Sequence, residues 1–441
     1  MIDQRPVGAG PEPELYTSAT RRFAAALVQD GIDELSAATD RGTALRYPSE
    51  RGGQRHEVVT GNRLPAVPPE FRDLAAGHQE LVEAGADAIH EGAVAPAAAV
   101  DLAVRIRDSA RRACADIGFV QVRVEEFAQH MTVSRPGLSP RGETRRWVRL
   151  VVRTTAGRDG VTRTASLLAA APDWDELVRG AEQRCPGRRA AEAATGLLTA
   201  HPLPDGELPV VFAGATAATF VHEVCGHVLE GDLLADRRSL LAGLAGAELA
   251  TGALTVSDDP RIAGRWGSYT VDDEGSEAVA VTLIEAGRLA GQITCRASAD
   301  RLGVRATGHG RRADYQRPPL PRLTNTVVQA GPERPDALLS GIGHGVLVTE
   351  VAGGHVNPMT GDFTVQVAAA RAIRAGRPAE TLGAGVIRGN VRTALAGIGA
   401  VADDVAVVDS VCVKRGQRMP VSFSSPSLLV EQGLQLSGGR P

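Results

Sequence analysis

Apolar residues recur at two spacings along this 441-residue chain, and each spacing predicts a different kind of element. Recurrence every three to four positions is expected for one face of a helix. Alternation with polar residues is expected for a strand with one buried face. The helical spacing predicts helices over residues 20–38, 96–117 and 173–198. The alternating spacing predicts strands over residues 43–47, 56–60, 119–124 and 146–152.

The character of the chain changes after residue 204, where short apolar runs punctuated by glycine replace the helical spacing. The segment HPLPDGELP holds three prolines in nine residues, so we place a domain boundary near residues 200–208. Glycine-rich turns between short apolar runs favour antiparallel strands. Such strands are predicted over residues 208–212, 268–271, 278–285, 345–351, 363–368 and 405–413.

Together these patterns predict an α+β protein, with an N-terminal mixed α/β domain followed by a largely antiparallel β C-terminal domain. Residues 1–16 are rich in proline and glycine and are expected to form a flexible tail. The N-terminal domain is then expected over residues 17–204 and the C-terminal domain over residues 205–441.

Composition narrows the possible functions. A net charge of −4 argues against a nucleic-acid-binding protein, because such proteins carry a basic excess that neutralises phosphate. No signal peptide is recognisable, and the longest apolar run, about residues 240–256, falls short of a membrane span. The five cysteines include no CxxC pair, which suggests reduced thiols or a metal ligand. We therefore expect a cytoplasmic protein with no nucleic-acid or membrane partner.

The strongest local signal is a pair of histidines around a glutamate, His222-Glu223-Val224-Cys225-Gly226-His227. It is similar to the HExxH zinc motif with one extra residue between the histidines. Positions i and i+5 lie about 140° apart on an α-helix, so both rings reach one ion only through a π-type bulge or a break. Gly226 is where the backbone most easily supplies it. Glu223 is then a candidate general base for an activated water.

A zinc site that acts in catalysis usually has three protein ligands and an open fourth position. Spacing alone does not choose the third ligand. Cys225 is close in sequence, although a small buried core residue is its simpler interpretation. The candidates are Cys225, Glu230, Asp232, His309, His344, His355 and Cys412.

Five ordered motifs resemble those of the TldD side of the TldD/PmbA (modulator of DNA gyrase) family. The segment HEVCGHVLEGD at 222–232 resembles the family signature HExxGHxLEGD. The segment TGHGRRADY at 307–315 is similar to TGNGRRxSY, and LPRLTNT at 320–326 is similar to MPRMTNT. DDEG at 272–275 and VCVKRGQRMPV at 411–421 complete the series. The resemblance covers about residues 205–440, with weaker similarity over 98–200.

This resemblance implies a zinc-dependent peptidase of two-domain α+β design, with the metal buried in the C-terminal β domain. Its Zn²⁺ ligands would be His222, His227 and Cys412, and Glu223 would be the general base. Substrates of such a family are unfolded peptides, bound as an extended strand. The resemblance also implies pairing with a PmbA/TldE-like homologue, or a homodimer.

Other motif residues have two interpretations each. His309, Arg311, Arg312, Tyr315 and Asn325 are candidates for substrate binding. The arginines could equally form salt bridges within a loop, and Tyr315 and Asn325 could fix the proline-rich loop 316–322. Glu230 and Asp232 are candidates for orienting the histidines. Residues 272–274 are better explained as a hairpin turn than as a second metal site.

The chain also departs from the family pattern. His309 replaces the usual asparagine, Val413 replaces the glycine after the cysteine, and the first module, about residues 17–97, is short and eroded. These departures suggest a rival function, a specialised hydrolase that cleaves an amide in a peptide-like natural product. A second rival is a binding subunit without catalytic activity, although the retained ligands and base weigh against it.

Overall fold

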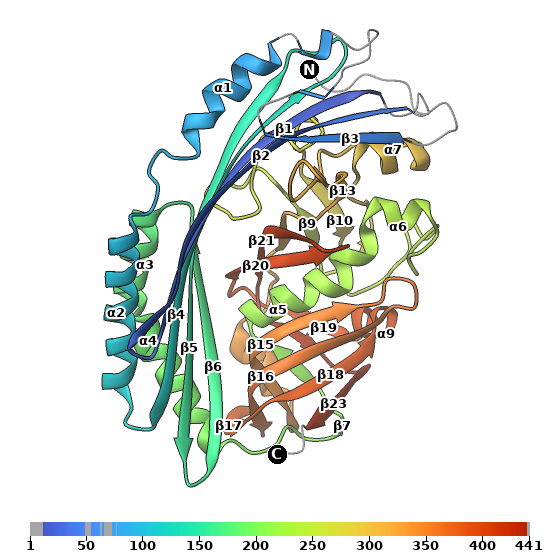
Figure 1. Ribbon diagram of the computed structural model, residues 1–441. Helices are drawn as coiled ribbons and strands as arrows, with labels where there is room; N and C mark the ends of the chain where they lie inside the picture. Colours follow the sequence, from blue (N-terminus) through green and yellow to red (C-terminus); the bar gives the residue numbers. More distant parts are fainter. Residues whose placement is uncertain (1–11, 49–53, 62–63, 66–72, 76, 439–441) are drawn as a thin grey trace.

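The computed structural model describes residues 12–48, 54–61, 64–65, 73–75 and 77–438. The chain forms an N-terminal half, residues 12–204, and a C-terminal half, residues 205–438. One long, curved sheet of the N-terminal half bends around the C-terminal half (Figure 1). The mixture of helices and mostly antiparallel sheets confirms the predicted α+β class. None of the helices among these residues has the length and hydropathy that crossing a membrane requires.

The N-terminal sheet has six strands in the order β3-β2-β1-β4-β5-β6, and every neighbouring pair is antiparallel. Its strands are β1 (Glu14–Val28), β2 (Gly31–Pro48), β3 (Gln54–Thr60), β4 (Ile117–Ser134), β5 (Arg141–Arg158) and β6 (Val161–Ala171). The strands predicted at 43–47, 56–60, 119–124 and 146–152 lie within β2, β3, β4 and β5, respectively.

The helix predicted over residues 20–38 is wrong, because that segment is the hairpin of β1 and β2. Strand β1 lies in the middle of the sheet, and residues 23–27 are all buried. A strand buried on both faces loses its apolar–polar alternation and cannot be told from a helix by spacing. The tail prediction is also wrong in part, because β1 begins at the buried Glu14. Residues 1–11 lie outside the described residues.

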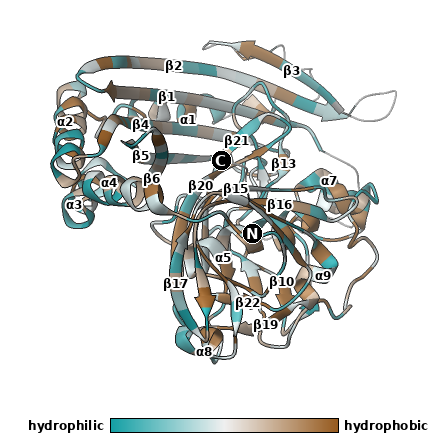
Figure 2. Cartoon of the chain, turned by 90° about the horizontal axis from the view of Figure 1, so that it is seen from below, coloured by the Kyte–Doolittle hydropathy of each residue, from teal (hydrophilic) through white to brown (hydrophobic). Residues whose placement is uncertain are grey.

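Helices cover the face of the N-terminal sheet that is turned away from the C-terminal half (Figure 2). They are α1 (His78–Ala88), α2 (Pro96–Ala113), α3 (Trp174–Arg184) and α4 (Pro186–Gly196), followed by the 3₁₀ turn η2 (Leu197–Thr199). Apolar residues of α2, α3 and α4 pack against β1, β4 and β5 in one core cluster. The single helix predicted over 173–198 is broken at Cys185, which has a φ of 46° and precedes Pro186.

The C-terminal half contains a nine-stranded sheet, a six-stranded sheet and a short two-stranded one. The nine-stranded sheet comprises β7 (Gly206–Glu207), β8 (Val210–Phe212), β15 (His344–Val356), β16 (Asp362–Arg374), β17 (Arg377–Leu382), β18 (Gly385–Asn390), β19 (Ile398–Val401), β22 (Leu428–Val430) and β23 (Leu434–Gly438). The six-stranded sheet comprises β9 (Val256–Asp258), β10 (Val281–Glu285), β11 (Arg288–Leu289), β14 (Asn325–Val328), β20 (Ala406–Lys414) and β21 (Gln417–Ser425). The pair is β12 (Gly310–Arg311) with β13 (Leu320–Pro321).

Most predicted C-terminal strands lie within these sheets, but the strand predicted at 268–271 is wrong. Only Val271 pairs there, in an isolated bridge with Glu277 across a tight turn. The helices and helical turns are α5 (Gly214–Val221), η3 (His222–Gly226), η4 (His227–Leu229), α6 (Gly231–Ala235), α7 (Arg296–Leu302), α8 (Pro335–Ser340) and α9 (Val391–Ala396). The main core packs α5 and η3 against both large sheets, which buries the segment that carries the paired histidines.

Candidate metal centre

The two histidines of the HEVCGH segment reach one side of a helix through a π turn. Helix α5 continues directly into the π turn η3, and the N–H of His227 donates to the carbonyl oxygen of His222, five residues earlier. The ring centroids of the two histidines are 4.7 Å apart, at an interplanar angle of 80°. The predicted π-type bulge is therefore present.

Gly226 has a different role from the one expected. Its φ of −70° and ψ of −63° are ordinary helical values, so no special backbone freedom is used there. Instead, a Cβ atom at this position would lie 2.4 Å from Cδ1 of Leu323, which is fully buried. The glycine lets the loop that carries Leu323 pack directly on the π turn.

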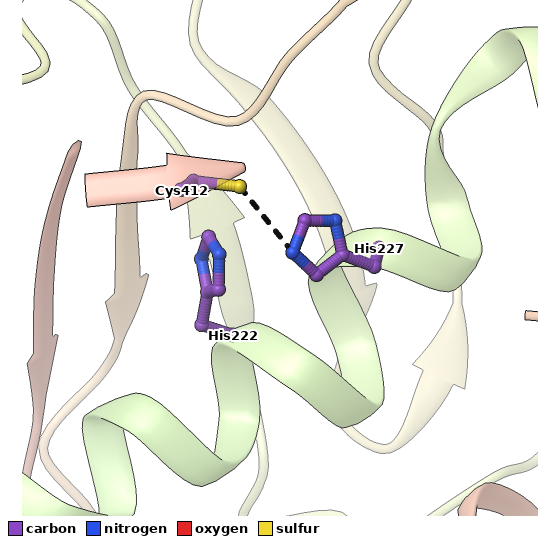
Figure 3. Close-up of side chains that lie close together, drawn as sticks. All are labelled: His222, His227 and Cys412. Atoms are coloured by element: carbon purple, nitrogen blue, oxygen red, sulfur yellow. Dashed lines mark hydrogen bonds between the residues drawn. The ribbon is translucent and has the colours of Figure 1, made fainter. Parts of the chain in front are cut away.

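The third member of the cluster is Cys412 of β20, which faces the two histidines (Figure 3). One ligand atom from each of His222, His227 and Cys412 lies within 4.8 Å of the others, and the Cys412 Sγ to His227 Nε2 distance is 3.4 Å. Cys225 points into the main hydrophobic core, where burial raises the pKa of its thiol. His344 and His355 are exposed on β15.

The cluster favours a thiolate at Cys412. Burial by itself raises the pKa of this thiol, but His227 and His222 more than compensate and hold it well below its ordinary value. Burial likewise opposes the charged form of His227, yet Cys412 and Glu230 raise its pKa well above the ordinary value. Because a thiolate is the form in which cysteine binds metals, the electrostatics of the site suit a metal ligand.

Each histidine also has an oxygen partner on its outer nitrogen. The Thr326 hydroxyl donates to Oδ2 of the buried Asp258 at 3.0 Å, and its oxygen lies 3.3 Å from His222 Nδ1. A hydroxyl has one proton, so Thr326 accepts from the Nδ1–H of His222. This tautomer leaves the Nε2 lone pair of His222 free for a metal. On His227, Nδ1 lies 3.5 Å from Oε1 of Glu230.

Lys414, the only lysine of the chain, ties the strand of Cys412 to the acidic residues after the histidines. Its Nζ lies 3.0 Å from Glu230 and 2.7 Å from Asp232. Although burial opposes the charged form of Glu230, Lys414 and His227 lower its pKa to about 2. Glu230 thus lies beside His227, whereas Asp232 contacts Lys414 and no histidine of the described chain, and the role of the two acids in orienting the histidines stays a prediction. Arg322 supports the same strand by donating to the carbonyl oxygen of Cys412 at 2.9 Å.

Glu223 is partly exposed and lies beside the bulged part of β15. A Cβ atom at Gly354 would come within 2.7 Å of Cγ of Glu223. Among the described residues, the Glu223 carboxylate makes no ion pair or side-chain hydrogen bond, so its oxygens are free to accept a proton. The absence of a side chain at Gly354 gives this carboxylate its space.

His309 is connected to the cluster indirectly. It is fully buried, with Nδ1 2.9 Å from the carbonyl oxygen of Thr307 and Nε2 3.2 Å from Oδ1 of Asp258. Asp258 also accepts hydrogen bonds from the backbone N–H and the hydroxyl of Thr324. His309 therefore helps to fix the carboxylate of Asp258. This carboxylate accepts a hydrogen bond from Thr326, and Thr326 in turn contacts His222.

Three more of the predicted substrate-binding residues are buried and engaged within the protein. Arg311 donates to two backbone carbonyl groups. The hydroxyl of Tyr315 donates to Asp40 of β2 at 3.0 Å, and Nδ2 of Asn325 donates to the carbonyl oxygen of Asp259 at 2.6 Å. Tyr315 and Asn325 thus fix loops, which was one of the two interpretations of the sequence. A substrate role for the three stays a prediction.

Arg312, the fifth predicted substrate residue, belongs to a buried ion cluster that joins the two halves. It pairs with Glu14 of β1, and Glu14 also lies 2.7 Å from Arg46. Arg46 is 2.5 Å from Glu274 of the C-terminal half. Burial opposes the charge of Glu14, but Arg46, Arg312 and Arg296 lower its pKa to about 2. This ion cluster was not foreseen from the sequence.

The acidic segment at 272–274 forms a turn, as preferred from the sequence. The carboxylate of Asp272 accepts the backbone N–H groups of Glu274, Ser276 and Gly310. Its oxygens are therefore used by the turn itself.

Sequence reasoning missed four residues around the metal cluster: Asp258, Arg322, Thr326 and Lys414. Arg322 and Thr326 lie within the LPRLTNT motif, and Lys414 is the only lysine of the chain. The motif and the single lysine could each have pointed to these residues from the sequence. Asp258 is one of many aspartates and carries no signal in the sequence.

With this geometry in hand, comparison with known proteins identifies the type of domain. The family model described as the PmbA/TldA metallopeptidase C-terminal domain matches residues 205–438. The chain therefore belongs to the PmbA/TldD family.

A metalloprotease TldD homolog from Haemophilus influenzae is 32% identical over 247 residues, which cover 56% of this chain and 51% of that protein. A metalloprotease from Methanothermobacter thermautotrophicus is 33% identical over 248 residues, covering 56% and 54%. The matched region thus spans about half the length of these curated relatives.

Solved structures share the fold over nearly the whole chain. A protein described as a modulator of DNA gyrase from Thermotoga maritima superposes with a TM-score of 0.76 at 20% identity, covering 97% of this chain and 96% of its own. TldE from Thermococcus kodakarensis gives a TM-score of 0.74 at 18% identity, covering 97% of each. At this level of identity, the likeness concerns the fold.

Proposed function

We propose that this protein is a zinc-dependent peptidase whose metal is held by His222, His227 and Cys412. The observation that carries the proposal is the convergence of these three side chains in a buried site at the end of the π turn. The relatives named metalloproteases and the metallopeptidase family model support the same reaction class.

The three side chains fit zinc in donor type, and the spacing of Cys412 and His227 fits as well. Imidazole nitrogen and thiolate sulfur are both zinc ligands, and three protein ligands leave a fourth position open. Tetrahedral bonds of about 2.3 Å to sulfur and about 2.1 Å to nitrogen place those two atoms about 3.6 Å apart. The Sγ–Nε2 distance between Cys412 and His227 is 3.4 Å. When bound, zinc supplies Lewis acidity that polarises a carbonyl group and acidifies a water molecule.

Glu223 is the general base in this proposal. It follows the first ligand directly in sequence, and its carboxylate has no competing hydrogen-bond partner among the described side chains. It would accept a proton as the peptide bond is attacked and return that proton to the leaving amine. Glu230 and Lys414 keep the outer side of His227 in place, while Thr326 and Asp258 do so for His222.

The proposed substrate is an extended, unfolded peptide or the precursor of a modified peptide. Strand β20, which carries Cys412, ends the six-stranded sheet, so one edge lacks a strand partner in the part of the chain described. A peptide can pair with such an edge through its backbone, which gives affinity without side-chain selection. A hydrolase that cleaves one peptide-like natural product is the alternative, and a panel of unrelated peptides separates the two.

We also propose that the protein works as a dimer in the cytoplasm, with a PmbA/TldE-like homologue or with a second copy of itself. A reducing compartment keeps Cys412 available as a thiolate. Native mass spectrometry of the chain, alone and co-expressed with a TldE-like homologue, reports the assembly.

The test measures zinc content by mass spectrometry together with peptide cleavage. We expect about one zinc per chain in the wild type and its loss, with activity, in Cys412→Ser. Cys225→Ser is the matched control and should keep its zinc, because Cys225 points into the core. Glu223→Gln should keep zinc but cleave about 10² to 10⁴ times more slowly. Full zinc occupancy in Cys412→Ser, or undiminished cleavage by Glu223→Gln, would contradict the proposal.

A further inference from the structure

A cavity of about 710 Å³ lies between the two halves, apart from the metal cluster. Its lining residues come from strands β1, β2, β4 and β5 on one side and from the loop 264–268 and the hairpin β20–β21 on the other. Val411 and Arg418 line it, whereas His222, His227 and Cys412 do not. Successive residues of a strand point to opposite faces of a sheet. Val411 therefore lies on the face of the hairpin opposite Cys412. Neither Glu223 nor any of the three proposed metal ligands lines this space, although Arg311, one of the predicted substrate-binding residues, does.

Aromatic rings from both halves form a continuous part of the cavity wall. Phe127 of β4 stacks on Trp147 of β5 with centroids 5.0 Å apart and an interplanar angle of 12°. Trp147 in turn contacts Trp266 of the C-terminal half, with centroids 4.8 Å apart. The guanidinium group of Arg22 lies 5.5 Å from the Phe127 centroid. The guanidinium group of Arg149 lies 5.8 Å from the Trp147 centroid, so arginines flank the aromatic part of the wall on both rings.

The charged residues of the wall are strongly biased towards arginine. Eight arginines and four glutamates line the cavity. All four glutamates already pair with arginines of the protein: Glu34 with Arg123, Glu125 with Arg123 and Arg149, Glu126 with Arg21 and Arg146, and Glu143 with Arg145. The acidic groups of the wall are therefore saturated, and the remaining arginines leave an excess of positive charge.

Four lining arginines form no ion pair with a carboxylate in the described part of the chain. Arg22, Arg265 and Arg418 are exposed and make no ion pair there, while Arg311 donates only to backbone carbonyl groups. The buried Nε–H of Arg311 has no acceptor.

The indole N–H groups of Trp147 and Trp266 also lack an acceptor, although Trp266 is only 7% exposed. Buried donors without acceptors are rare and costly. The wall thus holds unpaired donors and an excess of positive over negative charge.

We propose that this cavity binds a small organic anion that carries an aromatic ring. The ring would lie against Phe127 and Trp147, and the oxyanion would pair with Arg22 and Arg418. The volume is within the range of about 300–1,000 Å³ that is usual for small-molecule sites. A carboxylate and a phosphate share the required chemistry, and the experiment compares them.

The test measures binding to the full-length chain by calorimetry and by tryptophan fluorescence, in the presence of a metal chelator. The chelator makes the result independent of the proposed zinc site. The probes are phenyl phosphate and phenylacetate. Inorganic phosphate and phenol are the separate halves of phenyl phosphate, and acetate is the anionic half of phenylacetate. We expect one site per chain for at least one aromatic anion, with each half binding at least about tenfold more weakly. The stronger of the two aromatic anions identifies the preferred oxyanion.

Variants then locate the site. Because Arg22 and Arg418 are exposed, the double variant Arg22→Gln/Arg418→Gln should fold normally, and we expect it to weaken binding about tenfold or more. Arg153→Gln is the matched control, since Arg153 is an exposed residue of β5 outside the cavity, and it should bind like the wild type. The proposal is overturned if neither aromatic anion binds saturably, if inorganic phosphate binds as tightly as phenyl phosphate, or if the double variant retains wild-type affinity.

Discussion

The hydroxyl group of Thr326 offers the sharpest test of how the metal site is built. Thr326 is buried, and its hydroxyl accepts from His222 Nδ1 at 3.3 Å while donating to Asp258 at 3.0 Å. Thr326→Val keeps the side-chain shape but removes both contacts. Loss of an outer partner of a metal-binding histidine usually costs 10- to 100-fold in metal affinity. Because 3.3 Å is long for a hydrogen bond, we expect the zinc affinity of Thr326→Val to fall by the lower end of this range, about tenfold or about 1.4 kcal/mol.

The assay is the zinc dissociation constant, measured by competition with a chromophoric chelator at one fixed pH. Thr326→Ser retains the hydroxyl and should bind zinc within about threefold of the wild type. Thr324→Val is the matched control, because it also removes a hydroxyl from Asp258 but has no hydrogen bond to His222. If Thr326→Val binds zinc as tightly as the wild type, or no more weakly than Thr324→Val, the tautomer argument for His222 is refuted.

Three further predictions concern packing and charge. In Gly354→Ala, the new Cβ would lie 2.7 Å from Cγ of Glu223, so we expect peptide cleavage to fall about tenfold or more while zinc content stays at the wild-type level. Equal loss of zinc and cleavage would argue against this separation. In Gly226→Ala, the clash with buried Leu323 at 2.4 Å should lower the free energy of unfolding by about 1–3 kcal/mol, which urea titration measures; an unchanged midpoint would contradict it. In Glu14→Gln, buried arginines lose their counter-charge, and we expect a loss of about 3–5 kcal/mol at neutral pH. The folded-state pKa of Glu14 is lowered from 4.5 to about 2, so its contribution is complete above pH 4.5 and disappears as the pH falls towards 2. The difference in unfolding free energy between the wild type and this variant should therefore shrink by about pH 3, and a difference that grows on acidification would refute the argument.

The sequence predicted the paired histidines of the metal cluster and their π turn, because both follow from local spacing. An i, i+5 pair can share an ion only if one residue is inserted into the turn, and η3 has that geometry. Local spacing could not predict Cys412 as the third member, because it lies 185 residues from His227 in sequence. The two residues come together only because β20 lies beside the π turn in the fold. Spacing left several candidates open, and only the family resemblance singled it out.

The errors also have physical causes. The first part of the wrong helix at 20–38 arises because residues 23–27 of β1 are all buried, which removes the alternation that marks a strand. The second part arises because Ile32 and Leu35 of β2 are exposed apolar residues that happen to continue the helical spacing. Asp258 could not be found, because an isolated aspartate gains its role only when β9 and β14 pair. The ion cluster around Glu14 likewise depends on contacts between distant segments, which no local pattern encodes.

The same ion cluster has a consequence for synthesis of the chain. Glu14 and its partner Arg312 are separated by 298 residues. At about 5–20 residues per second, the glutamate is made roughly 15–60 s before that arginine. During this interval the buried carboxylate of β1 can pair with Arg46 of β2 but not with Arg312 of the C-terminal half. The final docking of β1 is thus tied to translation of the second half, and ribosomes stalled before residue 312 should present a nascent chain in which proteases still cleave near Glu14.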